Sequence, residues 1–482
     1  MNEQLRNPPL NVLMDRERAK KEFEPTPHER IVITGIAQTT SLGGTWETWD
    51  GINSGKSGAR EFDVENYHTS IAAPALFNPL DHFDAKRMDR DMTPIKAMAI
   101  VTAREAARNA GIIGPDGKIV QDLDRKKFGS WIGSGIGSTQ MLIDVYRAIY
   151  EEKNGVVDRR KNTRRGIPLT TGLRIFPEEI NGDVARELGL SGWGGSSVEA
   201  CATGLSNIVE AVRTIRDGYN DIAVAGGFED PLSDYAEVGI GLFAPLPVLS
   251  KRNDDPERAS RPFDKDRDGF VLASGGATVV VEGLDHALKR GAPILAEVIG
   301  FRKAMDGFDP MELDEERVAH MILSTMWDEK INNFNIPEAI FAHATSTRAG
   351  DIKEARLLRR ALTDILNHIP ITANKSNLGH LAGGAGSVNT VLGVQSLLVG
   401  RVPHIINLDN PEDGLEEIKD PDGNVIDSFR ISDLTLVRNQ PLVTNHSTAL
   451  VLGYGFGGHD AALLLRKWNT PQLQATTQQI AG

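Results

Sequence analysis

The segment Ser197-Val198-Glu199-Ala200-Cys201-Ala202-Thr203-Gly204 joins a strand-like run to the clearest helical pattern of the chain. Across residues 203–216, apolar side chains recur at the spacing of one helical face: Leu205, Ile208, Val209, Val212 and Ile215. Asp217-Gly218 then ends the pattern. The spacing predicts an amphipathic helix that begins directly after Cys201, with a strand in front of it.

Cys201 is the only cysteine in the chain, and the predicted helix places its sulfur at a helix N-terminus. Unpaired amides and the helix macrodipole favour the thiolate there, which makes a cysteine nucleophilic near neutral pH. The small residues Ala202 and Gly204 leave room for a substrate to approach. A buried, inert cysteine that only packs is the alternative that position alone leaves open.

Short β-branched runs bounded by glycine recur on both sides of this segment and predict strands. They lie at residues 31–34, 131–133, 222–225, 278–281, 371–373 and 449–453. Helical patterns separate them, which is typical of an α/β protein with largely buried strands. Residues 411–425 contain Asp420-Pro421-Asp422-Gly423 and are expected to form an exposed turn.

Length and composition narrow the class of protein. A chain of 482 residues with 40% hydrophobic residues can form two or three domains with substantial cores. The net charge of −13 argues against broad attraction to nucleic-acid phosphates or anionic lipid, so we expect no nucleic-acid partner. A single cysteine excludes an internal disulfide framework and a cysteine-based zinc cluster, and it fits a reducing compartment.

The apolar runs predict neither a leader nor a membrane span. The first 30 residues lack the continuous apolar core of a secretory signal. No window approaches the roughly 20 apolar residues of a membrane helix. We therefore expect a soluble, cytoplasmic protein without membrane insertion.

The sequence predicts that the chain divides into an N-terminal arm, two halves and a C-terminal tail. Residues 1–29 and 469–482 carry too little apolar area to offset chain entropy, and we expect an N-terminal arm and a tail there. Residues 30–288 form a first half, which carries Cys201. Residues 289–468 form a second half, and the two join near the start of that range.

His343 is a candidate hydrogen-bond donor in the second half. It ends the apolar run Phe341-Ala342, and the hydroxyl residues Thr345 and Thr347 follow it before a tight turn. A single histidine of this kind is also common as a structural residue. Its role is therefore open when it is considered alone.

Lys375 and His380 form a more specific pattern. They stand five residues apart between a strand-like run and the small-residue stretch 383–386, at a predicted strand-to-helix turn. Further on, residues 453–458 are dense in glycine and could aim backbone amides at a developing oxyanion, or could form only a tight turn.

The stretches around Cys201, His343, Lys375–His380 and residues 453–458, taken in this order, resemble the β-ketoacyl-acyl-carrier-protein synthases of the elongating type I/II class. The resemblance covers most of the chain, and its most distinctive parts are residues 249–256, 259–264 and 266–271. It implies an α/β thiolase-like fold of two pseudo-equivalent αβαβα halves in five layers, usually as a homodimer. Residues 133–137 could suggest a dinucleotide loop, but in the family this segment lies near the acyl pocket, so no cofactor is implied.

The resemblance assigns a role to each candidate residue. Cys201 would accept an acyl chain, and His343 and His380 would stabilise the enolate formed when a malonyl thioester loses carbon dioxide. Lys375 would support the two histidines. Other family positions would touch the substrate or gate the pocket: Thr345 and Thr347 along the phosphopantetheine arm, Phe456 at the oxyanion hole and gate, and Phe243 at the gate. No metal ion is implied.

The implied partner is an acidic acyl-carrier protein, which needs basic residues on this acidic chain. Candidate docking residues form two clusters, Lys86, Arg87 and Arg90 in one and Arg125, Lys126 and Lys127 in the other. The family also has an arginine where this chain has Pro247.

Several positions depart from the family pattern. Phe341 and Ala344 replace the usual asparagine and glycine beside the first histidine, and Ser274 and Asn389 replace two carboxylates. His459 takes the place of a common threonine. The expected function is decarboxylative Claisen condensation in fatty-acid elongation. The alternatives are a specialised-lipid or polyketide ketosynthase and a non-decarboxylating acyltransferase, and chain length and primer stay open.

Overall fold

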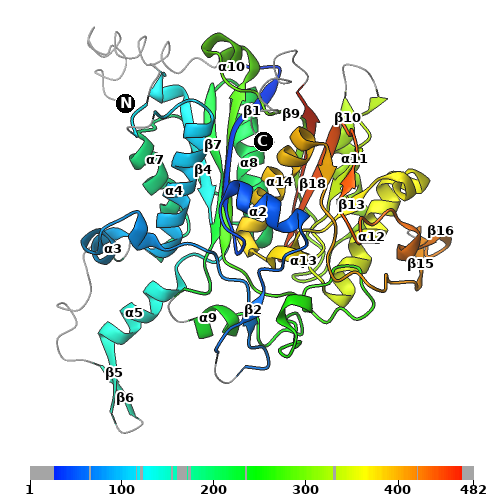
Figure 1. The fold of residues 1–482 in the computed structure, drawn as a ribbon, viewed down its shortest axis with the longest axis horizontal. Coiled ribbons are helices and arrows are strands. Elements are labelled where there is room, and N and C mark those ends of the chain that lie inside the picture. Colours follow the sequence, from blue (N-terminus) through cyan, green and yellow to red (C-terminus); the bar gives the residue numbers. More distant parts are fainter. Residues whose placement is uncertain are drawn as a thin grey trace, which may run out of the picture.

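One mixed sheet organises the structure, a computed structural model that describes residues 27–64, 67–114, 117–119, 123–153, 156–159, 171, 175–233, 236–328, 333–420 and 422–468 (Figure 1). Within these residues the sheet has nine strands. From edge to edge they are β13 (Ile371–Thr372), β12 (Ile340–Phe341), β18 (Thr448–Gly455), β19 (His459–Lys467), β9 (Ala296–Met305), β1 (Ile31–Thr39), β8 (Gly275–Gly283), β7 (Ile222–Glu229) and β4 (Phe128–Gly133). The six predicted strands are all present. β12, β9 and β19 lie outside the six predicted runs. β12 has only two residues, and β9 and β19 are rich in Ala, Leu, Arg and Lys rather than in β-branched residues.

Helices cover both faces of the sheet and divide the molecule into five layers (Figure 1). The outer pair on one side is α4 (Pro94–Asn109) and α7 (Glu179–Leu188), the central pair is α8 (Thr203–Arg216) and α14 (Ala385–Val399), and the other outer pair is α11 (Glu315–Met326) and α12 (Arg348–Leu362). The central helices contact strands from both parts of the sheet. The helix predicted over residues 203–216 is confirmed at both ends.

The two parts of the sheet repeat one pattern of strand directions. β13, β12 and β18 run parallel, and β19 and β9 follow antiparallel. β4 and β7 run parallel, and β8 and β1 follow antiparallel. The first part has five strands and the second has four. Gly195, which forms an isolated parallel bridge to Trp131 of β4, stands in the second part where β13 stands in the first. The two parts are therefore pseudo-equivalent, and β1 joins β9 at Ile31, Val32 and Ile33.

The expectation of a continuous strand before Cys201 is wrong. Residues 192–199 form no strand beyond the bridge at Gly195. Two hydrogen bonds hold this segment to the edge of the sheet, from Gly192 N–H to Phe128 O and from Gly195 N–H to Ser130 O. The composition of residues 192–195, Gly-Trp-Gly-Gly, explains the difference, because glycine weakens a strand and has no side chain to pack.

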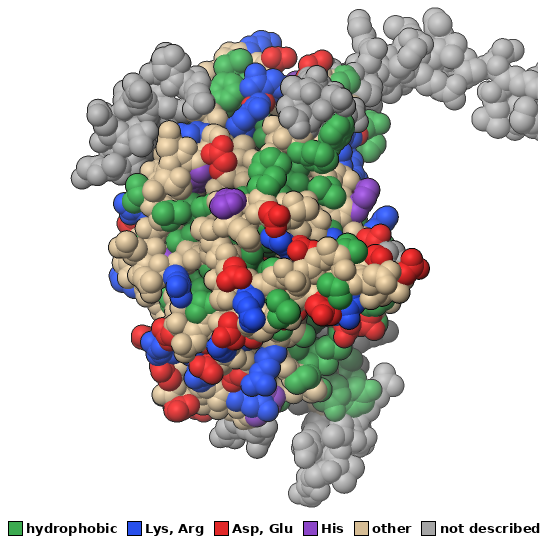
Figure 2. Space-filling view, turned by 90° about the vertical axis from the view of Figure 1, so that its right-hand side faces the viewer, with side chains coloured by type: hydrophobic (Ala, Val, Ile, Leu, Met, Phe, Trp, Pro, Cys, Tyr) green, Lys and Arg blue, Asp and Glu red, His purple; other side chains and the backbone are tan. Residues whose placement is uncertain are grey.

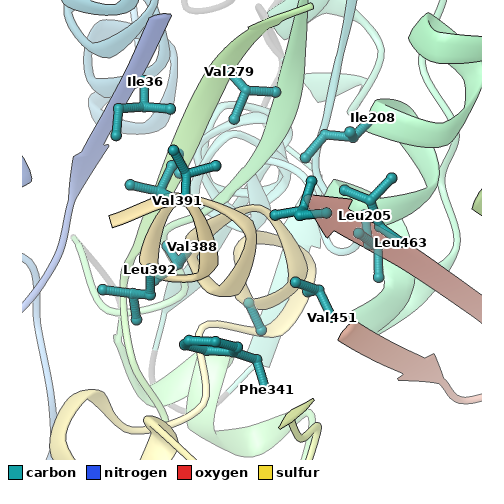
Figure 3. Packing of buried hydrophobic residues seen from close by; sticks show 14 of the residues in the cluster. Ile36, Leu205, Ile208, Val279, Phe341, Val388, Val391, Leu392, Val451 and Leu463 are labelled. Atoms are coloured by element: carbon teal, nitrogen blue, oxygen red, sulfur yellow. The ribbon is translucent and has the colours of Figure 1, made fainter. Parts of the chain in front are cut away.

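The core lies around α14. Figure 3 shows side chains of this helix packed among residues of both parts of the sheet and of α8: Val388, Val391 and Leu392 among Ile36, Leu205, Ile208, Val279, Phe341, Val451 and Leu463. α14 is buried from Ala385 to Leu397, and the polar side chains that it carries make hydrogen bonds, as Asn389 does with Ala342 O. The short 3-10 turns before the two central helices, η5 (Ala200–Ala202) and η8 (Ala382–Gly384), contact each other. The packing therefore brings the N-terminal ends of α8 and α14 together.

Smaller elements surround the layers. The remaining helices are α2 (Thr45–Asn53), α3 (Ala85–Asp91), α5 (Thr139–Ile149), α9 (Ala236–Gly241), α10 (Leu284–Arg290) and α13 (Lys375–Leu378). Two-stranded sheets pair β2 (Arg60–Glu61) with β3 (Ile71–Ala72), β5 (Tyr150–Lys153) with β6 (Val156–Arg159), β10 (Trp327–Asp328) with β11 (Asn333–Phe334), β14 (Arg401–Val402) with β17 (Leu442–Val443), and β15 (Leu415–Lys419) with β16 (Val425–Arg430). The exposed turn expected over residues 411–425 is thus partly a strand, and the turn proper connects a hairpin. None of the described helices is long and apolar enough to cross a membrane.

The predicted division between residues 288 and 289 stays a prediction. This point lies inside α10, near its C-terminal end, and β9, which follows the helix, is hydrogen-bonded to β1 of the first half. Most of the predicted arm and the whole predicted tail, residues 1–26 and 469–482, lie outside the described residues.

A buried ion pair closes the end of β8 that lies away from Cys201. Glu282 is fully buried, and Arg290 donates to both of its carboxylate oxygens, at 2.6 and 2.7 Å. Thr34 donates to the same carboxylate at 3.1 Å, and His286 contacts it at 2.5 Å. Burial opposes ionisation, but the hydrogen bonds from Arg290 and His286 hold the pKa of Glu282 below its ordinary value.

Replacing Arg290 with leucine should therefore destabilise the fold. The substitution leaves a buried carboxylate without its bidentate partner, which costs about 3 kcal/mol or more. Urea unfolding followed by circular dichroism measures the loss. Lys265→Leu, which removes one member of an exposed pair with Asp413, should leave the unfolding free energy close to that of the wild type. Equal losses in both variants would contradict the assignment.

Candidate active site

Cys201 lies in a tight turn against which the end of β18 packs closely. We call residues 199–202 the Cys201 turn. Ala200 has a φ of +45°, which strains a residue with a side chain by an amount on the order of 1–3 kcal/mol. A Cβ on Gly455, at the end of β18, would lie 2.4 Å from the carbonyl oxygen of Glu199 and 3.3 Å from the amide of Cys201. Only glycine allows β18 to approach the turn so closely.

His380 is the nearest titratable partner of the sulfur. Its Nε2 lies 3.1 Å from Cys201 Sγ, and both side chains are buried. The His380 amide donates to Val271 O at 2.7 Å, and Ala273 N–H donates to His380 O at 3.1 Å. Its Nδ1 is buried and makes no hydrogen bond within the described residues. The backbone of residues 271–273 therefore fixes where His380 lies, while nothing described fixes its tautomer.

His343 follows β12 and faces His380, with the ring centroids 5.5 Å apart and the ring planes nearly perpendicular. The amide N–H of Tyr454 donates to His343 Nδ1 at 3.3 Å. Because Nδ1 accepts, the proton of the neutral imidazole resides on Nε2. Glu354 of α12 holds the backbone of this segment by accepting from the amides of His343 (2.7 Å) and Ala344 (2.5 Å).

Lys375 supplies a buried positive charge behind the two histidines. It begins α13, and its ammonium donates to the carbonyl oxygen of His343. Burial lowers the pKa of Lys375 to about 8, although Glu354 and Cys201 pull it upward. Burial also lowers the pKa of His343 and of His380 well below its usual value, and Lys375 adds to both effects. Both imidazoles are therefore neutral at physiological pH.

The thiol of Cys201 is shifted in the opposite sense from the one expected. Burial raises its pKa to about 12, and the charge of Glu229 adds to the rise while Lys375 opposes it. The position at the N-terminus of α8 is confirmed, and the helix macrodipole there works together with Lys375. The sequence pattern could not reveal that packing in the folded protein removes water from the sulfur.

Thr345 and Thr347 lie together on the turn after His343. Their hydroxyl oxygens are 3.0 Å apart, and both side chains are partly exposed. Thr347 Oγ1 also accepts from the Gly350 amide at 3.2 Å and so caps α12. The structure therefore brings both predicted threonines to the same wall of the site.

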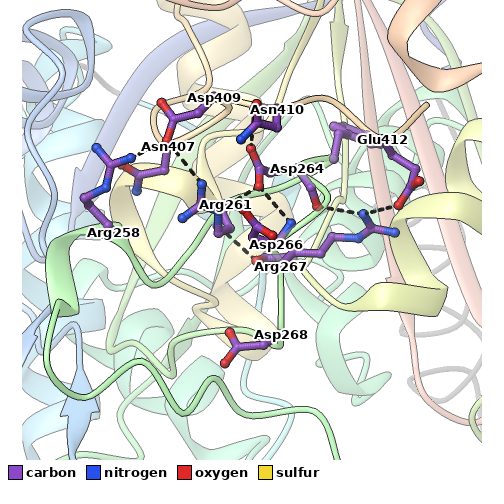
Figure 4. Close-up of polar contacts among 12 residues, drawn as sticks. Arg258, Arg261, Asp264, Asp266, Arg267, Asp268, Asn407, Asp409, Asn410 and Glu412 are labelled. Atoms are coloured by element: carbon purple, nitrogen blue, oxygen red, sulfur yellow. Dashed lines mark hydrogen bonds and ion pairs between the residues drawn. The ribbon is translucent and has the colours of Figure 1, made fainter. Parts of the chain in front are cut away.

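An ionic network around Arg267 supports this turn, and its contact with Glu412 is drawn in Figure 4. Arg267, which is 1% exposed, donates to Thr347 O at 3.0 Å and to Glu412 at 3.2 Å. Asp351 is fully buried and accepts from the amide of Ser346 at 3.0 Å. Ser346 has a φ of +67°. The network holds a strained backbone conformation between the two threonines.

The two predicted gate residues lie apart along the chain. Phe456, in the turn between β18 and β19, is 37% exposed. Phe243 is partly buried and packs edge to face on Phe270 at 5.6 Å, and Phe270 packs in the same way on His380 at 5.1 Å. Phe243 thus reaches the catalytic candidates through one intervening ring. His459 begins β19 opposite Gly455.

Three of the departures from the family pattern lie behind the histidines. Phe341 is fully buried in the core around α14. Asn389 donates from Nδ2 to Ala342 O at 3.1 Å. The hydroxyl of Ser274 is buried and makes no hydrogen bond within the described residues. In the described part of the chain no three His, Cys, Asp or Glu side chains gather closely enough to hold a metal ion.

The docking candidates differ in how far they are engaged. Lys86 and Arg125 are exposed. Arg87 pairs with Glu187 at 2.9 Å, and Lys127 donates to Gly218 O at 2.9 Å. The side chain of Arg90 lies outside the described residues.

Sequence reasoning missed two buried carboxylates that shape the site. Glu354 holds the His343 backbone, and burial raises its pKa to about 7. Glu229 ends β7 and accepts from the amides of Gly135 (2.9 Å) and Gly383 (3.0 Å), which ties together loops from both halves. Glu229 gave a signal, because it is the one charged residue of the apolar strand β7. Glu354 gave none, since it is one of several charged residues in α12.

Replacing Gly455 with alanine should displace the Cys201 turn. A Cβ 2.4 Å from Glu199 O forces a shift of several tenths of an ångström or more, and overpacking of this kind costs about 1–3 kcal/mol. We expect alkylation of Cys201 by iodoacetamide to slow by about tenfold or more. Gly414→Ala is the matched control, since its nearest atom would be 3.5 Å away, and it should alkylate at the wild-type rate. An unchanged rate in Gly455→Ala would contradict the close approach.

Comparison with known proteins places this geometry in a family. Residues 28–287 match the model of the beta-ketoacyl synthase N-terminal domain, and residues 295–409 match that of the C-terminal domain. A relative named 3-oxoacyl-[acyl-carrier-protein] synthase 2 from Coxiella burnetii is 34% identical over 91% of this chain and 98% of its own length. A relative of the same name from Vibrio cholerae is 35% identical over 80% of this chain and 90% of its own length.

Solved structures agree with this result. A beta-ketoacyl synthase from Burkholderia phymatum superposes with a TM-score of 0.77 at 25% identity, covering 91% of this chain and all of that one. A ketosynthase complex that contains a type II polyketide acyl-carrier protein gives a TM-score of 0.76 at 26% identity over 92% of this chain and all of that one. The resemblance seen in the sequence and the thiolase-like fold it implied are confirmed, and the chain belongs to the β-ketoacyl synthase family.

Proposed function

We propose that the chain catalyses decarboxylative Claisen condensation between an acyl group on Cys201 and a malonyl group on an acyl-carrier protein, in fatty-acid elongation. The observation that carries this proposal is the contact of 3.1 Å between Cys201 Sγ and His380 Nε2, with the His343 ring 5.5 Å beyond. One thiol beside two neutral imidazoles suits acyl transfer followed by enolate formation.

The first step transfers the acyl chain to the enzyme. As Cys201 Sγ attacks the thioester carbonyl, its proton passes to His380 Nε2. The bond to the carrier sulfur then breaks, and the departing thiolate takes that proton. The amides of Cys201 and Phe456 stabilise the tetrahedral oxyanion, which is where negative charge develops. The products are an acyl-Cys201 thioester and a free carrier thiol.

The second step generates the carbanion. The malonyl thioester loses carbon dioxide, and the electron pair of the broken bond moves into an enolate. His343 donates from Nε2, because Tyr454 N–H occupies its Nδ1. His380 is a proton acceptor in the first step and a donor in the second, which its unfixed tautomer allows. Neutral donors suit this task, since they do not neutralise the enolate by protonating it.

The third step forms the carbon-carbon bond. The carbanion attacks the acyl carbonyl on Cys201, and the sulfur leaves as a thiolate that regains one proton from solvent. The product on the carrier is a 3-oxoacyl chain longer by two carbons. Lys375 holds the His343 carbonyl and keeps a positive charge near the sulfur through the cycle.

Substrate contacts follow from the walls of the site. Thr345 and Thr347 would hydrogen-bond the phosphopantetheine arm, and Phe456 and Phe243 would open and close the acyl pocket. The support is position, because the threonine hydroxyls lie together and partly exposed on the turn after His343.

The proposed partner is an acidic acyl-carrier protein. Lys86 and Arg125 are the foremost docking candidates, since both are exposed. On the face shown in Figure 2, acidic and basic side chains are intermixed without a basic patch, so that face offers no attraction to an acidic partner. A homodimer and a cytoplasmic location belong to the same proposal.

Polyketide condensation is the second candidate. It is favoured by the superposition on a polyketide ketosynthase, whose TM-score is nearly equal to that of the Burkholderia enzyme. The higher sequence identity of the 3-oxoacyl synthase relatives supports fatty-acid elongation as the first candidate.

Incubation with acyl-carrier and malonyl-carrier substrates should yield carbon dioxide and a 3-oxoacyl carrier extended by two carbons, which mass spectrometry identifies. Cys201→Ala should abolish extension, because no other cysteine can accept the acyl chain. Acylated Cys201 without release of carbon dioxide would instead indicate a simple acyltransferase. Extension by Cys201→Ala would rule out the mechanism.

Charge reversal at the docking residues should weaken binding of the carrier protein without changing the rate of the chemical steps. We expect Lys86→Glu and Arg125→Glu each to raise the KM for malonyl-carrier several-fold, with kcat unchanged. This rise corresponds to a loss of about 1 kcal/mol in the free energy of carrier binding. The effect should shrink as salt is added, because exposed charges are screened. Lys419→Glu on the β15–β16 hairpin is the control. A rise of the same size with a malonyl-coenzyme A substrate would argue against a docking role.

A further inference from the structure

A group of charged side chains lies directly behind the Cys201 turn and takes no part in the steps above. Glu199 accepts a hydrogen bond from Ser206 Oγ at 2.5 Å and another from the ammonium of Lys303. Its own amide N–H donates to Thr203 Oγ1 at 2.8 Å. The first residue of the turn is therefore tied to α8 and to β9 at once.

Lys303 is the centre of this group. It lies on β9, in the part of the sheet that carries the histidines, and it also contacts Glu210 at 3.1 Å and Ser197 Oγ at 3.4 Å. The side chains of Lys303, Glu199 and Glu210 are 19%, 15% and 17% exposed. Charges buried to this extent are screened much less than a surface pair.

The end of β9 contacts both turns that would form the oxyanion hole. Lys303 holds Glu199 in the Cys201 turn. Three residues later, the amide of Asp306 donates to Gly458 O at 3.0 Å, in the turn that carries Phe456. Gly455 lies between the two turns, against the Glu199 carbonyl. The distance between the amides of Cys201 and Phe456 therefore depends on how β9 holds each side.

We propose that Glu199 and Lys303 are positioning residues that hold the strained Cys201 turn against β18, so that the Cys201 amide lies in register with that of Phe456. The ion pair opposes relaxation of the positive φ at Ala200, which would swing the amide of Cys201 away from the hole. The inference rests on the proposed role of Cys201 as acyl acceptor. A pair that served only to stabilise the fold would change the melting temperature and leave acyl transfer unchanged.

The test is single-turnover acyl transfer to Cys201, followed by mass spectrometry of the intact protein. We expect Glu199→Gln and Lys303→Met each to slow the transfer at saturating substrate by about tenfold or more, with the KM for the acyl thioester changed by less than about twofold. The reversed pair, Glu199→Lys with Lys303→Glu, should recover a large part of the rate.

Two further variants make the result decisive. Lys419→Met removes an exposed lysine that pairs with Glu417 on β15, and it should acylate at the wild-type rate. Ser206→Ala keeps both charges and removes only a neutral donor to Glu199, so it tests the inference if the charge variants fail to fold. It should slow transfer a few-fold, with little change in melting temperature.

The inference is overturned if Glu199→Gln and Lys303→Met acylate at the wild-type rate. It is also overturned if their rates fall only in proportion to the unfolded fraction and the reversed pair restores nothing. Cys201→Ala separates these results from a failure of the proposed function. If Cys201→Ala still extends chains, the proposed function fails; if only Cys201→Ala is inactive, the positioning role alone fails.

Discussion

The close approach of main chain to main chain around Cys201 is the constraint on which the site depends. A Cβ on Gly227 of β7 would lie 2.6 Å from the Cα of Gly204, so α8 sits directly on the strand beneath it. The same Cβ would lie 2.6 Å from the carbonyl oxygen of Gly383, just before α14. Both central helices are therefore drawn to one point. The meeting of Cys201 with His380 at 3.1 Å follows from that packing.

Burial then sets the chemistry of the groups that meet there. It lowers the pKa of both histidines and of Lys375, and raises that of the thiol. Two imidazoles that look alike in the sequence are made different by backbone contacts. His343 has its Nδ1 occupied by an amide, whereas no described group occupies Nδ1 of His380. One is therefore a dedicated donor, and the other can change between acceptor and donor.

The sequence allowed much of the fold to be predicted, because periodic apolar patterns and glycine boundaries report local structure. The helix over residues 203–216, the six strands and the family resemblance are all confirmed. The missing strand before Cys201 follows from the glycines of residues 192–195, which the strand prediction did not take into account. The raised pKa of the Cys201 thiol could not be predicted, since it depends on packing. The same holds for the bond between Tyr454 and His343, which are 111 residues apart. The catalytic roles themselves stay predictions until they are tested.

A wall made of main chain has an evolutionary consequence. Substitution at Gly204, Gly227 or Gly455 has nothing to remove and can only add atoms where none fit. Substitution at these three glycines can therefore obstruct the space around Cys201 but cannot widen it. Substitutions that enlarge the site must come from positions that carry side chains. Variation at the three glycines is thus more restricted than variation at positions that carry side chains.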